Sequence, residues 1–386
     1  MRERGRAVVV GAGVSGLTTA LCLRAERFSV TIVADRFAPQ VTSVVAGALW
    51  EWPPAVCGYH HDQISLERSK AWCMTSYRRF IDLAGDPATG VHFRPAVFYF
   101  TSRVEERSSD LRKMNELRDQ VQGFRHDASL IQENGVSPAY GVVDAYMHMA
   151  PMVDTDQYMD WLRQSAVRAG CEIRQQFVPG SLRDHEAAIR SAFGADIIAN
   201  CSGLGAMQLT PEPMYPLRGA LVRVKNDGRR FPRITAAHCV SHDESSGGQD
   251  IVFIVPRGED MLVLGGLAEA DEWSTDIGLH NHQPVRDMYE RCLRFLPQLA
   301  QGEIDPAEPV RAGLRPFRRA NVRVDHEAGT SIIHNYAHGG AGVTFSWGCA
   351  REVAETAAML WDASVRDRSN AQISMPFPAA SAAANT

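Results

Sequence analysis

The sequence RAVVVGAGVSG at residues 6–16, followed by SVTIVAD at residues 29–35, decides the fold of the first part of this chain. The apolar run AVVV predicts a buried β-strand over about 6–10, and the residues after the glycines predict a helix through about Arg27. SVTIV then predicts a second strand. The order of strand, glycine-rich turn, helix and strand is the opening of a βαβ dinucleotide-binding fold.

The three glycines of GAGVSG have separate physical tasks in such a fold. Gly11 allows the tight turn after the strand, Gly13 lets the backbone approach a pyrophosphate, and Gly16 permits close packing of the helix on the strand. Asp35 follows the second strand, 24 positions after Gly11 (35 − 11), where a carboxylate can accept hydrogen bonds from a ribose. A bare tight turn is the alternative, and the flanking strands together with Asp35 favour dinucleotide binding.

Two kinds of strand follow along the chain. Short apolar runs at about 172–177, 196–200 and 331–335 are bordered by Gly, Ser or Asn, which is typical of buried parallel strands. The second of these ends in a small-residue turn, which predicts that Ser202 and Gly203 lie close to a cofactor. A strand followed by an ordinary loop is the alternative there.

The second kind of strand is longer and partly alternating, as in antiparallel sheets, and IVFIVPRGEDMLVLGG predicts a hairpin that turns at 257–260. We therefore expect an α/β (α+β) fold in which a Rossmann-like dinucleotide-binding domain is interleaved with an antiparallel-sheet substrate domain. The predicted domain segments are 1–50, 141–210 and 311–366 for the first, and 51–140 and 211–310 for the second. The small, polar composition of residues 367–386 predicts a disordered tail. The polar stretch at 241–250 predicts a mobile loop or a solvated connection.

Composition and charge exclude several classes of function. The 386 residues are 45% hydrophobic and 22% charged, as in globular proteins, and the formal charge of −5 gives no reason to expect a nucleic-acid partner. No stretch approaches the roughly 20 apolar residues of a membrane span, so no membrane association is expected. The eight cysteines form no CxxC pair and no histidines cluster at ligand spacing. We expect no disulfide framework, no metal and a cytoplasmic, reducing compartment.

Six further motifs make the sequence more specific than the glycine-rich turn alone. In chain order they are ADRF after the second strand, AGALW, NCSGLGA, MYPLRG, GLRPFR and HNYAHGGAGVTFSWGCA. From about Val8 to Ala357 the chain resembles the D-amino acid oxidase family. The resemblance implies FAD rather than NAD as the cofactor, with the isoalloxazine ring held between the two domains.

The resemblance also implies cofactor contacts at the matching positions. The pyrophosphate, adenosine and flavin would be surrounded by Gly11, Gly13, Val14, Ser15, Gly16, Asp35, Arg36, Thr42, Ser43, Gly47, Ala48, Leu49, Gly339, Gly340, Gly342, Val343 and Thr344. Asp35 would bind the ribose, and Arg36 would lie close to the adenosine. The last glycine cluster begins a helix, whose free N–H groups suit the negative charge of a reduced flavin. A close-packed turn into that helix is the alternative.

For the substrate, the resemblance points to Arg315 and Gly340. Arg315 would hold the substrate α-carboxylate through two parallel hydrogen bonds, for which a guanidinium is suited. The carbonyl of Gly340 would accept a hydrogen bond from the amine and so aim Cα–H at flavin N5. Hydride transfer then needs no general base, so His148, His334 and His338 are expected to be hydrogen-bonded structural histidines.

Three positions depart from the family pattern. Phe253 and Gln249 stand where the animal enzymes carry tyrosines, and Phe253 removes one carboxylate hydrogen bond, on the order of 0.5–3 kcal/mol. Gln249 or water can replace that bond. Glu51 stands where the family usually has an uncharged residue, and it would favour a cationic or hydrogen-bond-donating substrate if it faces the pocket. Solvation at the surface is the alternative for Glu51.

We therefore expect an FAD-dependent oxidase that uses O2 to convert a small D-amino acid, or a close analogue, to an imino acid. Hydrolysis of the imino acid gives the 2-oxo acid and ammonia, and the reduced flavin gives hydrogen peroxide. Alternatives are a related flavin oxidase of glycine, a secondary amine or a pathway-specific amino acid, and a flavin-binding protein that has lost catalysis. The sequence leaves open the stereochemistry about Arg315 and the assembly, including a homodimer.

Overall fold

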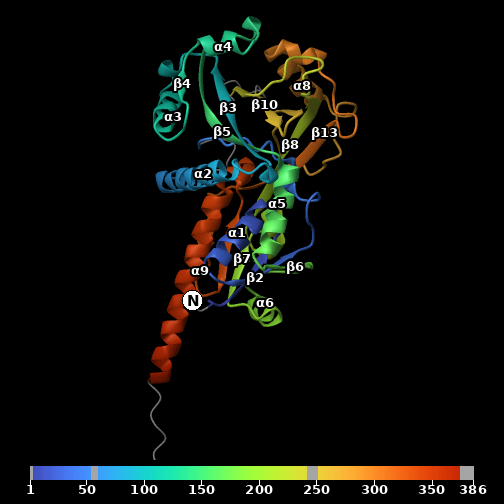
Figure 1. Cartoon of the computed structure of the whole chain (residues 1–386). Helices are drawn as coiled ribbons and strands as arrows, with labels where there is room; N and C mark the ends of the chain where they lie inside the picture. The colour runs from blue at the N-terminus through green and yellow to red at the C-terminus, as the bar shows by residue number, and fades with distance from the viewer. Residues whose placement is uncertain (1–2, 54–59, 241–250, 374–386) are drawn as a thin grey trace, which may run out of the picture.

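The computed structural model describes residues 3–53, 60–240 and 251–373, with side chains through 366. Within these residues the chain forms a six-stranded sheet and a nine-stranded sheet. Figure 1 shows the two sheets in separate halves of the molecule, with the horizontal helix α2 (Gln63–Leu83) between them. The fold class predicted from the sequence, a Rossmann-like part interleaved with an antiparallel sheet, is confirmed.

The six-stranded sheet contains the βαβ unit predicted from the first 35 residues. Its spatial order is β14-β15-β7-β1-β2-β6, with parallel pairing except between β14 and β15. The strands are β1 (Arg6–Val10), β2 (Ser29–Ala34), β6 (Glu172–Gln175), β7 (Ile197–Asn200), β14 (Arg323–His326) and β15 (Ile332–Tyr336). All five strands that the sequence predicted for this sheet are present.

Helices cover both faces of the six-stranded sheet, which explains why its inner strands β1, β2, β7 and β15 are mostly buried. The edge strands β6 and β14 are more exposed, so the apolar run predicted at 172–177 forms a strand that is not buried. Val9 packs in one core with α1 (Val14–Ala25) and α9 (Gly342–Ile373). Val8 and Val10 point the other way and pack with α6 (Glu186–Phe193). Figure 1 shows α1, α5 (Thr155–Arg168) and the long α9 running side by side.

The nine-stranded sheet has the order β12-β8-β11-β10-β9-β3-β5-β4, and β13 pairs with β8 as well. The strands are β3 (Val91–Phe100), β4 (Arg125–His126), β5 (Asp144–Val153), β8 (Met214–Lys225), β9 (Ala237–Val240), β10 (Val252–Arg257), β11 (Met261–Gly265), β12 (Glu269–Ala270) and β13 (Val310–Arg318). Strands β10 and β11 form the predicted hairpin. The helices of this half are α3 (Ser108–Arg118), α4 (Ser129–Glu133) and α8 (Gln283–Phe295).

The sheets depart from two of the predicted domain boundaries. Strands β5 and β13 belong to the nine-stranded sheet, although the boundaries at 141 and 311 assign them to the nucleotide-binding part. The physical reason is pairing along their whole length, β5 with β3 and β13 with β8. The chain enters the six-stranded sheet only after these strands end.

The predicted start of the disordered tail at residue 367 is wrong, because α9 continues through Ile373. Residues 350–373 contain no Gly or Pro and are rich in Ala, which favours helix. Residues 374–386 and the predicted loop at 241–250 lie outside the described residues. Within the described chain, no helix combines the length and the apolarity needed to cross a bilayer. The cysteines described there are free thiols, and Cys57 lies outside the described residues.

Candidate functional site

A cavity of about 1620 Å³ runs between the two sheets. It begins at the carboxyl ends of β1 and β2, which is where open parallel sheets bind ligands. It ends on the nine-stranded sheet. The predicted residues that line it are Gly11, Gly13, Val14, Ser15, Asp35, Arg36, Thr42, Ser43, Gly47, Ala48, Leu49, Glu51, Ser202, Gly203, Phe253, Arg315, Gly339, Gly340, Gly342, Val343 and Thr344. Of the other two predicted residues, Gly16 is not among the lining residues and Gln249 lies outside the described residues.

The turn between β1 and α1 brings the backbone of Gly11, Gly13 and Val14 to the cavity wall. Gly11 has φ +113°, and a Cβ there would lie 2.4 Å from the Cys201 carbonyl oxygen. Helix α1 begins at Val14 without a side-chain cap and without an acidic residue in its first turn. Its positive end therefore suits an anion such as a pyrophosphate.

Gly16 serves the packing role predicted from its spacing. A Cβ at Gly16 would lie 1.9 Å from the Gly11 carbonyl oxygen. Because that oxygen belongs to the turn itself, a side chain at this position would push the helix away from the strand. Gly16 thus shapes the turn from behind rather than lining the cavity.

Asp35 and Arg36 mark the end of the cavity next to β2. Both side chains are exposed, and Arg36 Nε donates a hydrogen bond of 3.2 Å to Asp35 Oδ2. The neighbouring wall, residues 176–178, was not singled out from the sequence. Its position follows from β6, which pairs in parallel with β2 and so ends at the same edge of the sheet.

The segment from Thr42 to Leu49 is held in place by buried polar contacts. Val14 N donates to Ser43 Oγ (2.9 Å), and Thr155 Oγ1 donates to the Val44 carbonyl (2.7 Å). The buried Arg257 donates to Thr155 Oγ1 (2.7 Å) and to the Ala46 carbonyl (2.5 Å). Burial lowers the pKa of Arg257 to about 10, so the side chain remains a cation near neutral pH. Arg257 was missed because an arginine beside a hairpin turn is usually solvated.

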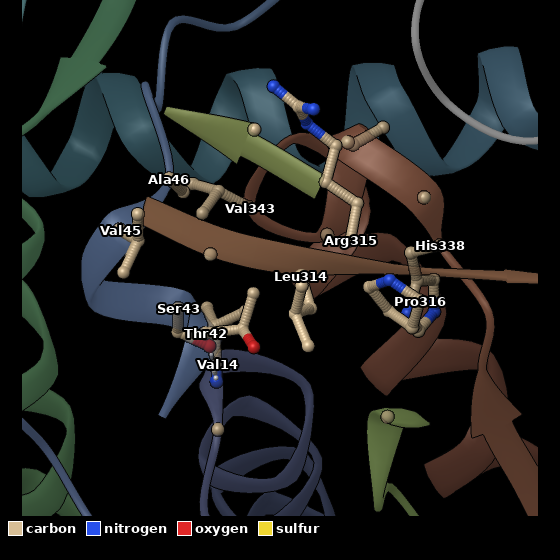
Figure 2. A pocket seen from close by; sticks show the side chains of 18 of the residues that line it. Val14, Thr42, Ser43, Val45, Ala46, Leu314, Arg315, Pro316, His338 and Val343 are labelled. Atoms are coloured by element: carbon tan, nitrogen blue, oxygen red, sulfur yellow. Dashed lines mark hydrogen bonds between the residues drawn. The ribbon is translucent and has the colours of Figure 1, made fainter. Parts of the chain in front are cut away.

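The residues that line the cavity fit FAD in the chemistry of their donors. Glycines that a Cβ would crowd form the turn at the first sheet, and the N-terminus of α1, which begins after Gly13 without an N-cap side chain, faces the same space. The starting residues of α9 also line it, which gives a second set of helix N–H groups. Figure 2 shows Val14, Thr42 and Ser43 together on one side of β13. FAD bound here would place its pyrophosphate at α1 and its ring toward the nine-stranded sheet.

Arg315 lies on β13 where the cavity meets the nine-stranded sheet. Figure 2 shows its guanidinium pointing away from its neighbour Leu314. Nη1 donates to the carbonyls of Leu267 (3.1 Å) and Arg218 (3.4 Å). Burial alone lowers the pKa of Arg315 to about 10, and no carboxylate of the described chain contributes to that pKa. Among the described residues, no carboxylate compensates the positive charge that Arg315 brings to the cavity wall, as expected of an anion-binding residue.

The remaining predicted substrate residues differ in what surrounds them. Gly340 is exposed to the cavity at the start of the α9 segment. The ring of Phe253 lies against Gly47, where a Cβ would be 2.4 Å from the ring carbon Cε1. Glu51 is among the residues that line the cavity and is partly buried. Burial raises the pKa of Glu51, and the nearby Lys113 lowers it.

The three histidines considered as possible bases all have hydrogen-bond partners. His338 lines the cavity, and its Nε2 is 2.9 Å from Asn335 Oδ1. His334 Nε2 is 3.0 Å from Glu327, and His148 Nδ1 is 3.1 Å from the Met149 carbonyl. Burial lowers the pKa of both His148 and His338 to about 4, which keeps them neutral at physiological pH.

The fold also brings together Glu105, His126 and Asp144, whose ligand atoms lie within 4.8 Å of one another. These residues are far apart in the sequence, so spacing could not reveal them. Both oxygens of Asp144 already accept hydrogen bonds, from the backbone of Val104 and Ala145 and from His126 Nε2. The cluster is therefore satisfied by the protein's own donors.

Comparisons with known proteins agree with this site. The sequence profile of the FAD dependent oxidoreductase family DAO matches residues 6–356. A D-amino-acid oxidase of Rubrobacter xylanophilus is 35% identical over 92% of this chain and 98% of its own length. The human D-aspartate oxidase is 27% identical over 91% and 94%. The glycine oxidase of Geobacillus kaustophilus superposes with a TM-score of 0.71 at 17% identity, covering 92% of this chain and 95% of its own. The chain belongs to the DAO family of FAD-dependent oxidoreductases, and FAD is its cofactor.

Proposed function

We propose that this protein is a D-amino acid oxidase, which converts a D-amino acid and O2 to the imino acid and hydrogen peroxide. The observation that carries the proposal is Arg315, a cation on the cavity wall without a carboxylate partner in the described chain. A substrate carboxylate is the anion that matches a guanidinium fork. Relatives named D-amino-acid oxidase, at 35% and 33% identity, support the same substrate class.

The residues of this chain bind and orient the substrate. Arg315 holds the carboxylate, and the carbonyl of Gly340 accepts a hydrogen bond from the amine, which fixes the direction of Cα–H. When bound, FAD would supply the acceptor for the hydride from Cα and the route of the electrons to O2. No residue has to remove the Cα proton as H⁺, and the neutral His338 stays hydrogen-bonded to Asn335. Water then hydrolyses the released imino acid to the 2-oxo acid and ammonia.

Anaerobic reduction of the bound flavin tests this function directly. D- and L-amino acids, glycine and N-methylglycine are each mixed with the holoenzyme, and loss of the oxidised-flavin absorbance is followed. We expect reduction by D-amino acids and peroxide release after air is admitted. Reduction by L-amino acids alone, or by none of these compounds, would overturn the proposal.

Arg315→Ala separates the anchor from the cofactor site. We expect the variant to retain FAD, with the substrate concentration for half-maximal reduction raised about 10- to 100-fold, because two charge-assisted hydrogen bonds are lost. Arg315→Lys keeps the charge without the fork and should recover only part of that loss. Arg229→Ala, at a side chain that is 86% exposed, is the matched control. Wild-type behaviour of Arg315→Ala at low substrate would remove Arg315 from the site.

A further inference from the structure

The guanidinium of Arg315 is held by backbone acceptors at one of its three nitrogens. Nη1 donates to the carbonyls of Leu267 (3.1 Å) and Arg218 (3.4 Å), two acceptors that match its two N–H groups. Nε and Nη2 have no hydrogen-bond partner among the described residues. These two nitrogens form an edge that can bind both oxygens of a carboxylate. The direction of that edge therefore depends on the two carbonyls that hold Nη1.

The Leu267 carbonyl belongs to a segment between β11 and α8, residues 266–276, which we call the strap. Within the strap, β12 pairs with β8 so that Glu269 lies opposite Arg218. Strand β12 is only two residues long, so backbone pairing ties little of the strap to the sheet. The position of the Leu267 carbonyl therefore depends on side-chain contacts as well.

The side chain of Arg218 makes those contacts. Its Nε and Nη2 lie 2.9 and 2.8 Å from Glu269 Oε2, and its Nη1 donates to the Ser274 carbonyl at 2.8 Å. Glu272 adds a longer ion pair, 3.6 Å from Nη1. The Arg218 side chain is only 5% exposed, so solvent screens these interactions weakly. Arg218 thus holds the strap at three positions.

The Glu269 carboxylate is held from both sides. Its Oε2 accepts from Arg218, and its Oε1 lies 3.0 Å from Nε2 of His282, the residue that precedes α8. Both oxygens are therefore engaged, and the negative charge of Glu269 compensates Arg218. Arg315 keeps its own positive charge for a ligand.

Arg218 and Arg315 act from opposite faces of the sheet. The Arg315 guanidinium lies over Gly219, and neighbouring residues in a strand point to opposite faces, so the Arg218 side chain points away from it. Neither Arg218 nor Glu269 is among the residues that line the cavity. Any effect of this pair on a bound ligand must therefore pass through the carbonyls that hold Arg315.

We propose that Arg218, through its ion pair with Glu269, is a positioning residue that fixes the carboxylate-binding edge of Arg315. Both acceptors of Arg315 Nη1 depend on Arg218, because one is its own carbonyl and the other lies on the strap that its side chain holds. A loosened strap would let the guanidinium turn, and two parallel hydrogen bonds require its direction to be fixed. This inference rests on the proposed function, in which Arg315 binds the substrate carboxylate.

Replacing both charges tests the pair without leaving one buried charge alone. Arg218→Met/Glu269→Met removes the side-chain contacts and keeps the backbone pairing of β12 with β8, and apolar replacement of a buried ion pair is compatible with folding. Propionate, a carboxylate without an amine, is titrated into the holoenzyme and its Kd is read from the flavin absorbance. We expect this Kd and the KM for D-alanine to rise about tenfold, with FAD content unchanged and kcat within about threefold of wild type.

The matched control is a second buried ion pair on β8. Arg223 Nε lies 3.0 Å from Asp305 Oδ2, with side chains 14% and 11% exposed, and neither residue lines the cavity. Arg223→Met/Asp305→Leu should leave the propionate Kd and the KM for D-alanine at wild-type values. If the Arg218→Met/Glu269→Met variant also shows wild-type values, the inference is overturned, whatever the thermal stability of that variant.

A conservative variant keeps the test valid if the double replacement does not fold. Arg218→Lys retains the charge, but a single ammonium cannot reproduce the contacts of a guanidinium fork with both Glu269 and the Ser274 carbonyl. We expect a smaller rise of the propionate Kd, about threefold, again with kcat and FAD content close to wild type. A wild-type Kd in this variant would count equally against the inference.

A double-mutant cycle distinguishes positioning from a general loss of structure. If Arg218 acts through Arg315, the Arg218→Met/Glu269→Met change should alter the propionate Kd less than about twofold in the Arg315→Ala background. The same fold-change in both backgrounds would refute action through Arg315.

The two ligands separate this inference from the proposed function. If no D-amino acid reduces the flavin, the proposed function fails, and propionate binding still tests the role of Arg218. If D-amino acids reduce the flavin and both KM and Kd are indifferent to the Arg218–Glu269 pair, the proposed function stands and the positioning role fails.

Discussion

The guanidinium of Arg315 lies directly against the Cα of Gly219, where an added Cβ would be 2.4 Å from Nη1 and 2.6 Å from Cζ. Such distances are shorter than any contact between real atoms of this kind, so only glycine permits this position of Arg315. Gly219 is therefore a positioning residue for the carboxylate anchor, and it acts from the neighbouring strand, β8.

Gly219→Ala should displace the anchor without disturbing the cofactor. We expect KM for the amino acid to rise about tenfold or more, because the guanidinium loses its orientation toward the carboxylate. The flavin spectrum and FAD content should stay at wild-type values. Steady-state peroxide assays measure the change, with Gly85→Ala, at an exposed position, as the control. An unchanged KM would show that Arg315 has room to move.

Alanine substitutions at Gly13 and Gly16, both in the first turn, should have different effects on stability and on FAD binding. At Gly16 the new methyl group would lie 1.9 Å from a backbone oxygen, so Gly16→Ala should lower the free energy of unfolding by about 3 kcal/mol or more. At Gly13 the nearest atom is Ser43 Oγ at 3.1 Å, so the apoprotein should fold while FAD affinity falls. Urea unfolding and FAD titration distinguish these effects. Equal free energies of unfolding for the two apoproteins would contradict a packing role for Gly16 and a cofactor-binding role for Gly13.

Phe253→Tyr should restore a hydroxyl to the cavity wall. Because the ring already lies in the cavity, the new O–H can donate to the substrate carboxylate, a gain of about 0.5–1.5 kcal/mol. We expect KM for D-alanine to fall up to tenfold, and the effect should be much smaller in the Arg315→Ala background. A rise in KM would mean that the hydroxyl is crowded by Gly47.

Acid should destabilise the protein through its buried neutral histidines. Burial lowers the pKa of His148, His238 and His338 from 6.5 to about 4. Between these values the unfolded chain binds more protons than the folded chain, so stability is lost as the pH falls from 6.5 toward 4. Each such histidine should cost on the order of 2 kcal/mol between pH 7 and pH 5.

His148→Phe isolates one of these contributions. His148 stacks on Phe98 with an interplanar angle of 13°, and a phenyl ring can keep that stack without titrating. The pH dependence of urea unfolding should therefore weaken by about 2 kcal/mol in this variant. His280→Gln, at an exposed site, should leave it unchanged. If the unfolding free energy of the variant depends on pH as strongly as that of the wild type, His148 does not contribute to the loss of stability in acid.

The parts of the site that sequence could predict are those made by local chain geometry. The turn from Gly11 to Gly16 is specified by adjacent residues, and it forms as predicted. Arg315 and Phe253 were found only through family motifs, because nothing local distinguishes an arginine that binds substrate from one that pairs with a carboxylate.

The missed residues act across long stretches of sequence. Arg257 holds the Ala46 carbonyl, Lys113 acts on Glu51, and Gly219 makes room for Arg315. Each depends on which strands and helices become neighbours, and periodicity does not contain that information. The predicted domain boundaries at 141 and 311 differ from the structure for the same reason, because β5 and β13 pair with strands that are distant in the chain.

The cofactor cavity uses both ends of the chain, from Gly11 to Thr344. During synthesis, the glycine turn leaves the ribosome hundreds of residues before the start of α9 is made. FAD can therefore meet a complete site only when translation is almost finished. Until then β7 also lacks its neighbour β15. Cofactor loading is thus a late step in the life of each newly made chain, and a chain truncated before residue 339 would lack the wall that α9 begins.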